Sequence, residues 1–291
     1  MASFYFFSFM KNKRYNGRPD LFSYFKKKGY AQKKRFMNTT EKIKHIVKWL
    51  DDYANSANIK GFVIGVSGGI DSAVTSTLCA MTGKKIIVLN MPILQPPSQF
   101  DRSNEHIEWL KNSFDAVESH TTDLTKTFEQ MSMDLPEAIQ DFLTMANVRA
   151  RLRMTTLYAY AGHNGFLVAG TGNKVEDFGV GFFTKYGDGG VDLSPIADLT
   201  KTEVFELAKE LKIITSIQVA KPTDGLWDDD RSDEDQIGAS YPELEWAMEY
   251  IENKSSEKLS PRQAEVMEIY TRLNKANRHK MDPIPVCVIE R

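Results

Sequence analysis

One short glycine-rich segment constrains the fold of this chain more than any other feature. It directly follows the apolar run 61–64, directly precedes a helix-like segment at 73–81, and reads Gly65-Val66-Ser67-Gly68-Gly69-Ile70-Asp71-Ser72. A buried strand, a sharp turn and a helix start together favour an anion site, because glycines let the backbone approach a phosphate and a helix N-terminus attracts negative charge. Ser67 and Ser72 add hydroxyl donors, and Asp71 adds a hard oxygen ligand for Mg²⁺. The segment therefore predicts a phosphate site in an α/β domain.

Two common nucleotide loops are excluded at this position. The segment has no lysine where G-x-x-x-x-G-K-[ST] requires one, and it does not fit the G-x-G-x-x-G pattern of hydride-transfer dinucleotide sites. The pattern S-G-G-x-D-S instead resembles the PP-loop of ATP pyrophosphatases, which cleave ATP between the α and β phosphates. The structural alternative is a tight turn without a ligand. The full match in a strand–turn–helix context favours the PP-loop.

Strand-like and helix-like segments alternate along the chain. The β-like runs are 60–66, 85–91, 116–120 and 165–171. Helical patterns are found at 43–55, 98–113, 124–131, 136–161, 202–211, 241–253 and 260–277. Because several β-like runs are apolar throughout, we predict a doubly wound, Rossmann-like parallel sheet with helices on both faces and a helical C-terminal part. Ligands of such sheets bind at the carboxyl ends of strands, where Ser67 and Thr171 both lie.

Charge is distributed unevenly between the N-terminal segment and the rest of the chain. Residues 1–36 contain ten Lys or Arg and the single acid Asp20, a net charge of +9, so the remainder carries −11 if the whole chain carries −2. We expect residues 1–36 to be a basic, aromatic-rich extension that need not be ordered, and 37–291 to be a single domain. The extension can be dispensable, a basic interaction arm or a targeting peptide.

Bulk composition excludes several classes of partner. The acidic remainder predicts no general affinity for nucleic acid, and no apolar run approaches the length of a membrane helix, so no membrane partner is expected. Cys79 and Cys287 form neither a metal-ligand spacing nor a disulfide framework. These features suit a cytoplasmic protein.

Further motifs narrow the choice among PP-loop enzymes. They are N-V-R-A-R-L-R-M at 147–154, G-T-G-N-K-V-E at 170–176, F-F-T-K-Y-G-D-G-G at 182–190, K-P-T-D-G-L-W at 221–227 and His279-Lys280. Together with the PP-loop they resemble the NAD⁺ synthetase family over 37–291. The resemblance implies ATP-dependent amidation of deamido-NAD⁺ (nicotinic acid adenine dinucleotide) with ammonia through an NAD-adenylate, which releases AMP and pyrophosphate in the final step of NAD biosynthesis. It also implies Mg²⁺ and a homodimer, with helices 147–160 and 202–211 as candidate interfaces.

The resemblance assigns a role to each of the following residues. Asp71 and Glu176 are the expected Mg²⁺ ligands. The expected ATP contacts outside the loop are Thr171, Lys201 and Thr223. The expected deamido-NAD⁺ contacts are Arg151, Lys185, Asp192, His279 and Lys280. The expected catalytic residues are Asp71, Glu176, Lys201 and Asp188, of which Asp188 either orients ammonia or takes a proton from ammonium.

Each motif also has a purely structural interpretation. Arg151 can face solvent on its helix, 187–190 can be a hairpin turn, and Glu176 can sit in the first turn of a helix, where an acid is favourable. His279-Lys280 can be an exposed pair. Some relatives carry His-Ala-Ala before the metal-site glutamate, whereas this chain has Gly-Asn-Lys-Val at 172–175 and one extra residue before 184–186. We interpret this as a subtype difference that leaves contacts around 177–181 open.

Competing functions remain at this stage. The rivals are a GMP synthetase domain or a tRNA-modifying enzyme with the same loop, a nucleotide-binding regulatory module, and a nucleic-acid binder that uses the basic arm. Acidity outside 1–36 and the lack of Cys-x-x-Cys pairs argue against the tRNA-modifying enzyme, and the presence of both metal-site acids with Lys201 argues against the regulatory module. The nucleic-acid binder is left to be tested by deletion of residues 1–36. A glutamine-hydrolysing domain needs a cysteine nucleophile and far more residues than 1–36 offer, so we expect ammonia as the nitrogen donor.

Overall fold

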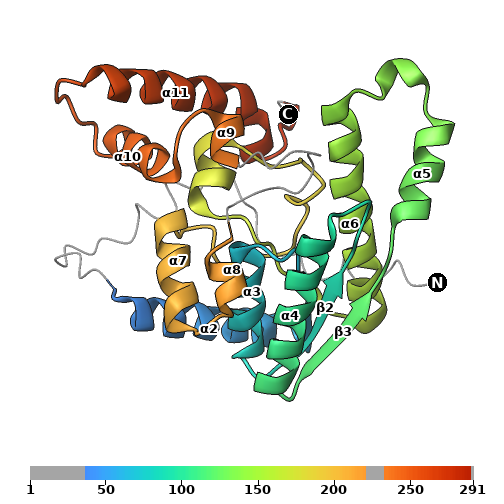
Figure 1. The fold of residues 1–291 in the computed structure, drawn as a ribbon. Helices are drawn as coiled ribbons and strands as arrows, with labels where there is room; N and C mark the ends of the chain where they lie inside the picture. Colours follow the sequence, from blue (N-terminus) through green and yellow to red (C-terminus); the bar gives the residue numbers. More distant parts are fainter. Residues whose placement is uncertain (1–36, 221–232, 290–291) are drawn as a thin grey trace. The chain divides into compact units, whose positions relative to one another are not determined.

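The computed structural model describes residues 37–220 and 233–289. From Asn38 onward the chain forms one unit. Within it, strands and helices alternate up to α6, and helices follow from α7 to the C-terminal region (Figure 1).

Four parallel strands form the central sheet. They are β1 (Gly61–Gly65), β2 (Lys85–Asn90), β3 (Val117–Thr121) and β4 (Leu167–Val168). Their order is β3-β2-β1-β4, with Ile64 opposite Val88 and Val63 opposite Val168. The chain adds β2 and β3 on one side of β1 and then returns to place β4 on the other side. The order therefore reverses between β1 and β4, where ligands of open α/β sheets bind.

Helices cover both faces of this sheet (Figure 1). One face packs against α2 (Thr39–Ser56), α3 (Ile70–Ala80), α4 (Pro97–Ser113), α7 (Lys201–Glu210) and α8 (Thr215–Gln218). The other face packs against α5 (Thr125–Asp134) and α6 (Phe142–Asn164). Alternate residues of β1 divide between the two cores, because Phe62 and Ile64 belong to the first and Val63 to the second. The predicted doubly wound architecture is confirmed.

The C-terminal part is helical, as predicted, and has a core of its own. It contains a π-helical turn η2 (Val175–Val180), α9 (Asp233–Ile237), α10 (Tyr241–Glu252) and α11 (Pro261–Met281). Leu244, Val266 and Tyr270 are buried in its centre. Capping boxes begin both long helices, with Ser240 and Glu243 at α10 and Ser260 and Gln263 at α11.

Two elements differ from the sequence prediction. The helix expected at 136–161 is divided into a 3₁₀ turn η1 (Glu137–Ile139) and α6, which begins after Asp141, because the Asp141 carboxylate accepts the N–H of Thr144 as a cap. The strand expected at 165–171 is reduced to Leu167–Val168. Gly165 ends α6 in the left-handed region, and the N–H of Gly170 already bonds to the carbonyl of Leu193. The π-helical turn, α8 and α9 were not predicted.

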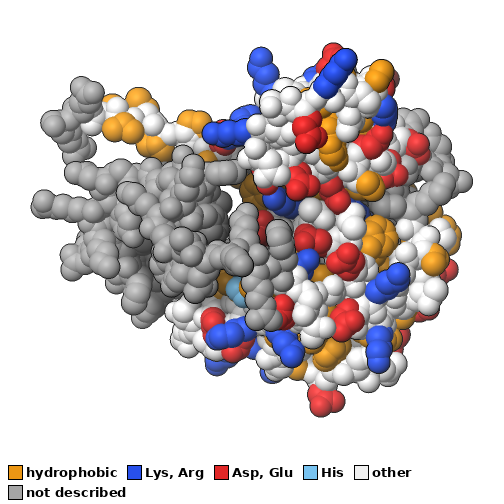
Figure 2. Space-filling view, turned by 90° about the vertical axis from the view of Figure 1, so that its left-hand side faces the viewer, with side chains coloured by type: hydrophobic (Ala, Val, Ile, Leu, Met, Phe, Trp, Pro, Cys, Tyr) orange, Lys and Arg blue, Asp and Glu red, His pale blue; other side chains and the backbone are white. Residues whose placement is uncertain are grey.

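Acidic and basic side chains are mixed on the face of the molecule drawn in Figure 2. Figure 2 looks from the left-hand side of Figure 1 and shows Asp and Glu interspersed with Lys and Arg over the described part of that face. Within residues 37–220 and 233–289, no helix has the length together with the apolar character that crossing a bilayer demands.

Candidate active site

The glycine-rich loop 65–72 connects β1 to α3 at the point where the strand order reverses. Gly68 has a φ of +81°, and a Cβ at this position would lie 2.9 Å from the carbonyl oxygen of Gln99, so both conformation and packing require glycine. Gly69 is the N-cap of α3 and provides no side chain to cap the helix. The first N–H groups of α3 therefore have no side-chain acceptor from their cap, which suits a phosphate oxygen.

Helix α4 packs against the outer side of this loop. The hydroxyl of Ser103 donates to the carbonyl of Val66 at 2.7 Å. The neighbouring Arg102 has its Cβ 3.4 Å from the position that a Cβ on Gly68 would take. Its Nε is buried and has no hydrogen-bond partner among the described residues. A cation with an unused donor thus lies beside the loop, although no sequence motif singles it out.

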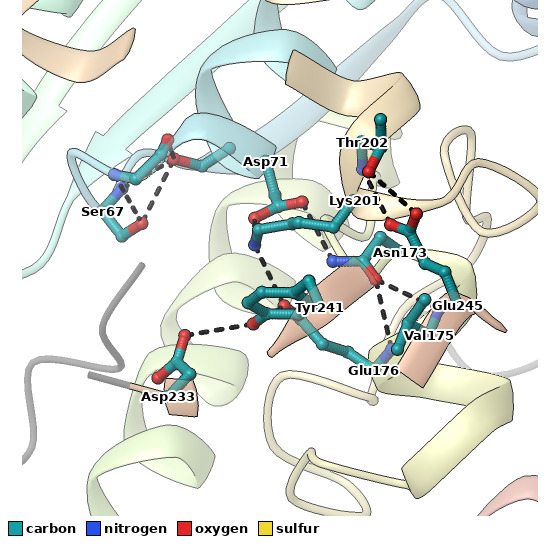
Figure 3. Close-up of polar contacts among 12 residues, drawn as sticks. Ser67, Asp71, Asn173, Val175, Glu176, Lys201, Thr202, Asp233, Tyr241 and Glu245 are labelled. Carbon is teal, nitrogen blue, oxygen red and sulfur yellow. Dashed lines mark hydrogen bonds and ion pairs between the residues drawn. The ribbon is translucent and has the colours of Figure 1, made fainter. Parts of the chain in front are cut away.

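Lys201 lies between the two acids predicted to hold magnesium (Figure 3). Its Nζ donates to Asp71 Oδ2 at 2.5 Å and to Glu176 Oε1 at 3.0 Å. Asp71 comes from the first turn of α3, Glu176 from η2 after β4, and Lys201 from the start of α7. Only 4% of the Lys201 side chain is exposed, against 17% for Asp71 and 16% for Glu176. The structure brings these three predicted residues into one cluster.

Burial and the Lys201 ammonium act in opposite directions on the two carboxyls. Burial raises the pKa of Asp71. At Glu176 burial is outweighed by Lys201 and by a hydrogen bond from Tyr241, so its pKa is lowered. Burial also opposes the charge on Lys201, but attraction to both acids raises its pKa above the ordinary value. Lys201 is therefore protonated and Glu176 ionised near neutral pH.

The donor set of this cluster fits a magnesium ion. Asp71 and Glu176 each direct a carboxylate oxygen at the same nitrogen of Lys201, so both acids face one cationic position. Mg²⁺ prefers oxygen ligands and is usually held by one or two carboxylates together with substrate phosphates. In the part of the chain that the structure describes, no group of three or more His, Cys, Asp or Glu is arranged so that it could hold a metal ion by itself. Two carboxylates beside a phosphate loop agree with a metal that arrives with ATP.

Asn173 connects the Asp71 carboxylate to the turn that carries Glu176. Its side chain is fully buried, and its Nδ2 donates to Asp71 Oδ1 at 3.1 Å. Its Oδ1 accepts the backbone N–H groups of Val175 and Glu176, each at 3.1 Å (Figure 3). Asparagine is a common helix-capping residue, but no local pattern indicates the contact of Asn173 with Asp71.

Tyr241 holds Glu176 from the C-terminal helices. The buried tyrosine hydroxyl donates to Glu176 Oε1 at 2.5 Å and lies 3.3 Å from Asp233 Oδ2. The ammonium of Lys201 also lies 4.8 Å from the centre of the Tyr241 ring, within cation–π range. Sixty-five positions separate Tyr241 from Glu176, and no local pattern points to their contact.

Three of the residues predicted to bind deamido-NAD⁺ form a chain of contacts. Arg151, which is exposed on α6, donates to the carbonyl of Lys185 at 3.4 Å. The Nζ of Lys185 donates to the carbonyl of His279 on α11 at 2.5 Å. The fold therefore gathers Arg151, Lys185 and His279 from three separate segments.

Lys280 and Asp188 line a cavity of about 150 Å³ with Asp177, Phe178 and Phe183. The Lys280 ammonium donates to the carbonyl of Phe183 at 2.8 Å, and burial lowers its pKa. The carboxylate of Asp188 accepts the N–H of Thr184 at 2.9 Å, which closes the 184–190 turn. The carboxylate of Asp188 and the amine of Lys280, which are distant in sequence, thus line the same small cavity.

The positions of the remaining predicted residues, Asp192, Thr171 and Thr223, give less information about ligand binding. Asp192 accepts the hydroxyl of Tyr158 at 3.0 Å and the N–H of Val168 at 2.8 Å, so its observed bonds connect β4 to α6. Thr171 is partly buried in the segment after β4. Thr223, with the rest of 221–227, lies outside the described residues.

Comparison with known proteins gives consistent matches. The family model described as NAD synthase matches residues 42–283. The NH(3)-dependent NAD(+) synthetase of Finegoldia magna is 39% identical over 226 residues, covering 76% of this chain and 88% of that protein. A solved NMN synthetase from Francisella tularensis is 31% identical with a TM-score of 0.77, covering 87% of this chain and 100% of that one. A solved NH3-dependent NAD synthetase from Campylobacter jejuni, at 22% identity and a TM-score of 0.71 over 87% and 100% of the two chains, supports the fold.

Proposed function

The chain belongs to the NAD synthase family, and on that premise we propose that it amidates deamido-NAD⁺ with ammonia and ATP to form NAD⁺. This is the final step of NAD biosynthesis. The observation that carries the proposal is the meeting of the glycine-rich loop with Asp71, Glu176 and Lys201 where the strand order reverses. The name of the Finegoldia relative supports ammonia as the nitrogen donor. We expect the reaction to take place in the cytoplasm.

The proposed chemistry has two steps. A nicotinate carboxylate oxygen attacks the α-phosphorus of ATP, the new O–P bond forms, and pyrophosphate leaves with the electrons of the broken P–O bond. Ammonia then adds to the acyl carbon of the adenylate, loses a proton, and AMP departs. Because the first step brings a triphosphate to a carboxylate, Lys201 and the N–H groups of 65–72 act by offsetting and orienting negative charge.

We assign Mg²⁺ to Asp71 and Glu176, where it would supply further charge neutralisation on the phosphates. Asp71→Asn keeps the size of the side chain and removes one of the two negative charges. We expect kcat to fall by about 100-fold or more, measured as pyrophosphate release, while circular dichroism shows that the variant keeps its fold. Asp52→Asn, at an exposed residue of α2 paired with Lys48, is the matched control. Normal turnover of Asp71→Asn would show that the metal assignment is wrong.

Product analysis tests the function as a whole. The purified protein is mixed with ATP, Mg²⁺, ammonium and deamido-NAD⁺, and products are quantified by chromatography. We expect NAD⁺, AMP and pyrophosphate in equal amounts, and no NAD⁺ when glutamine replaces ammonium. Accumulation of ADP and phosphate, or efficient use of glutamine alone, would refute the proposal.

Nicotinic acid mononucleotide is a second candidate substrate, because the chain also resembles a solved NMN synthetase. The two acids carry the same reacting carboxylate and differ in the adenylate half. Steady-state kinetics with each acid at saturating ATP and ammonium separate the candidates. A higher kcat/KM for deamido-NAD⁺ supports the first proposal, and a higher value for the mononucleotide supports the second.

We also propose a homodimer, with α6 as the contact surface. Along its 23 residues only Met145, Ala146 and Ala161 are buried, and Leu143 is 68% exposed. The apolar face of α7, the other candidate, already lies in the core that α7 shares with α2 and α3. Size-exclusion chromatography with light scattering at micromolar concentration is the test. A persistent monomer would count against the proposal.

A further inference from the structure

We propose that Asn173 is a positioning residue that fixes the orientation of the Asp71 carboxylate toward the cation position shared with Glu176. The inference rests on the proposed function only in treating this position as the Mg²⁺ site. Asn173 is fully buried, and its amide contacts segments that follow two different strands of the sheet. The motif in which it occurs gives it no role toward Asp71.

The contacts of Asn173 determine which way its amide faces. Its Oδ1 accepts two N–H groups at the start of η2, from Val175 and Glu176, and the first N–H groups of a helical turn need such an acceptor. The NH₂ group must then face Asp71, since an amide has its donors and its acceptor on opposite atoms. The turn that carries Glu176 and the donor that holds Asp71 are thus coupled through one side chain.

This coupling divides the two oxygens of Asp71 between two tasks. Oδ1 accepts from Asn173 at 3.1 Å, which leaves Oδ2 to face Lys201 and the position between the acids. Without the bond to Asn173, the Asp71 carboxylate is held about its terminal torsion, among the described residues, only by its contact with Lys201. Residues that bond a metal ligand from behind typically change metal affinity by about 10–100-fold when they are removed.

Asn173→Ser separates positioning from a merely structural role. A serine hydroxyl still accepts the N–H groups at the start of η2, as in a helix cap, but it is too short to reach Asp71. Asn38→Ser is a matched control, because Asn38 caps α2 through the N–H of Glu41 and lies outside the cluster. If the only task of Asn173 is to cap its turn, the two variants will behave alike.

The probe is Mn²⁺, whose binding is followed by electron paramagnetic resonance in the presence of a non-hydrolysable ATP analogue. We expect Asn173→Ser to weaken Mn²⁺ binding by about 10–100-fold and to raise the KM for Mg²⁺ in turnover, with the KM for ammonium unchanged. Asn38→Ser should match the wild type. Wild-type Mn²⁺ affinity in Asn173→Ser would overturn the inference.

A second variant and the choice of probe keep the test decisive. If Asn173→Ser lowers the melting temperature, Asn173→Thr is used, because its hydroxyl caps the turn and its methyl group fills part of the vacated space. Mn²⁺ binding is measured without deamido-NAD⁺. Failure of the proposed function would therefore appear as absent NAD⁺ synthesis in the wild type, whereas failure of this inference would appear as unchanged Mn²⁺ affinity in the variants.

Discussion

At the scale of single residues, the site is held by hydrogen bonds between positions that are distant in sequence. Glu176 Oε1 receives both the Lys201 ammonium and the Tyr241 hydroxyl, so three segments converge on one oxygen. Burial together with the neighbouring acids Glu176 and Asp233 raises the pKa of Tyr241 and keeps its hydroxyl a donor. A neutral hydroxyl donor can orient a carboxylate through a hydrogen bond without neutralising its negative charge.

Tyr241→Phe removes that donor and keeps the ring. We expect the free energy of unfolding to fall by about 1–3 kcal/mol, because a buried carboxylate oxygen loses a partner. We also expect a higher KM for Mg²⁺, since Glu176 loses one constraint. Denaturant unfolding and Mg²⁺ titration of turnover are the measurements, with Tyr250→Phe on the same helix as control. An unchanged KM for Mg²⁺ would mean that Tyr241 supports only the fold.

At the scale of elements, the packing of α3 against α4 supports the phosphate loop and buries a histidine. His106 on α4 is fully buried, its Nε2 lies 3.0 Å from the hydroxyl of Ser76 on α3, and its ring stacks on Trp109. Burial lowers the pKa of His106 to about 4, from an ordinary 6.5. The same helix carries Ser103, whose hydroxyl donates to the carbonyl of Val66 in the loop 65–72. His106 is therefore buried on the same helix that bonds to the loop through Ser103.

Because of His106, the free energy of unfolding is expected to decrease as the pH is lowered. The unfolded chain takes up the proton near pH 6.5 and the folded protein only near pH 4. The contribution is therefore complete above pH 6.5, declines as pH falls, and is lost below about 4, amounting to about 3 kcal/mol. Urea unfolding from pH 7 to pH 4 tests this. His106→Gln should flatten that dependence, and an equally steep curve in the variant would assign it to other groups.

Arg102 belongs to the same helix and supports a second prediction. Because its buried Nε has no partner in the described residues and its Cβ adjoins Gly68, we expect it to contribute to holding the phosphates of ATP. Arg102→Met should raise the KM for ATP and weaken binding of pyrophosphate by about tenfold, as expected for one lost charged hydrogen bond. Calorimetric titration with pyrophosphate measures the effect. Lys111→Met on the exposed end of α4 should bind like wild type, and equal binding by the two variants would contradict the role of Arg102.

At the scale of the whole molecule, the first helix of the described fold has its own N-terminal cap. Asn38 and Glu41 form a capping box at α2, and α2 is tied to α7 by the ion pair of Lys42 with Glu203 at 2.7 Å. The catalytic cluster therefore lies in a part of the chain whose first helix needs no preceding residue for its cap. Assignment of 37–291 as a single domain stays a prediction.

Deletion of residues 1–36 tests that assignment. We expect the protein that starts at Met37 to keep its melting temperature within a few degrees and its rate of NAD⁺ synthesis within about twofold, because the α2 cap and its contacts with α7 remain. Calorimetry and the product assay on both proteins are the measurements. A large loss of activity with an intact fold would assign a functional role to the basic segment.

Features that depend on neighbouring residues follow from the amino-acid sequence alone. The loop 65–72 predicts a phosphate site because glycines, hydroxyls and an acid lie in one turn. Apolar strands that alternate with helices predict a parallel sheet with two covered faces. The family and its reaction follow from motifs in a fixed order. These features need no knowledge of packing, because each is encoded within a single segment.

The contacts between those segments depend on how the distant elements pack in the folded chain. The strand order β3-β2-β1-β4 places Asp71 beside Glu176, and Lys201 joins them although 130 positions separate it from Asp71. No role is predicted for Asn173 from the sequence, and Tyr241 is predicted only as the first residue of a helix, yet both side chains bond the acids. Their partners are set by the packing of distant elements, and no periodicity or spacing within one segment can encode such a contact.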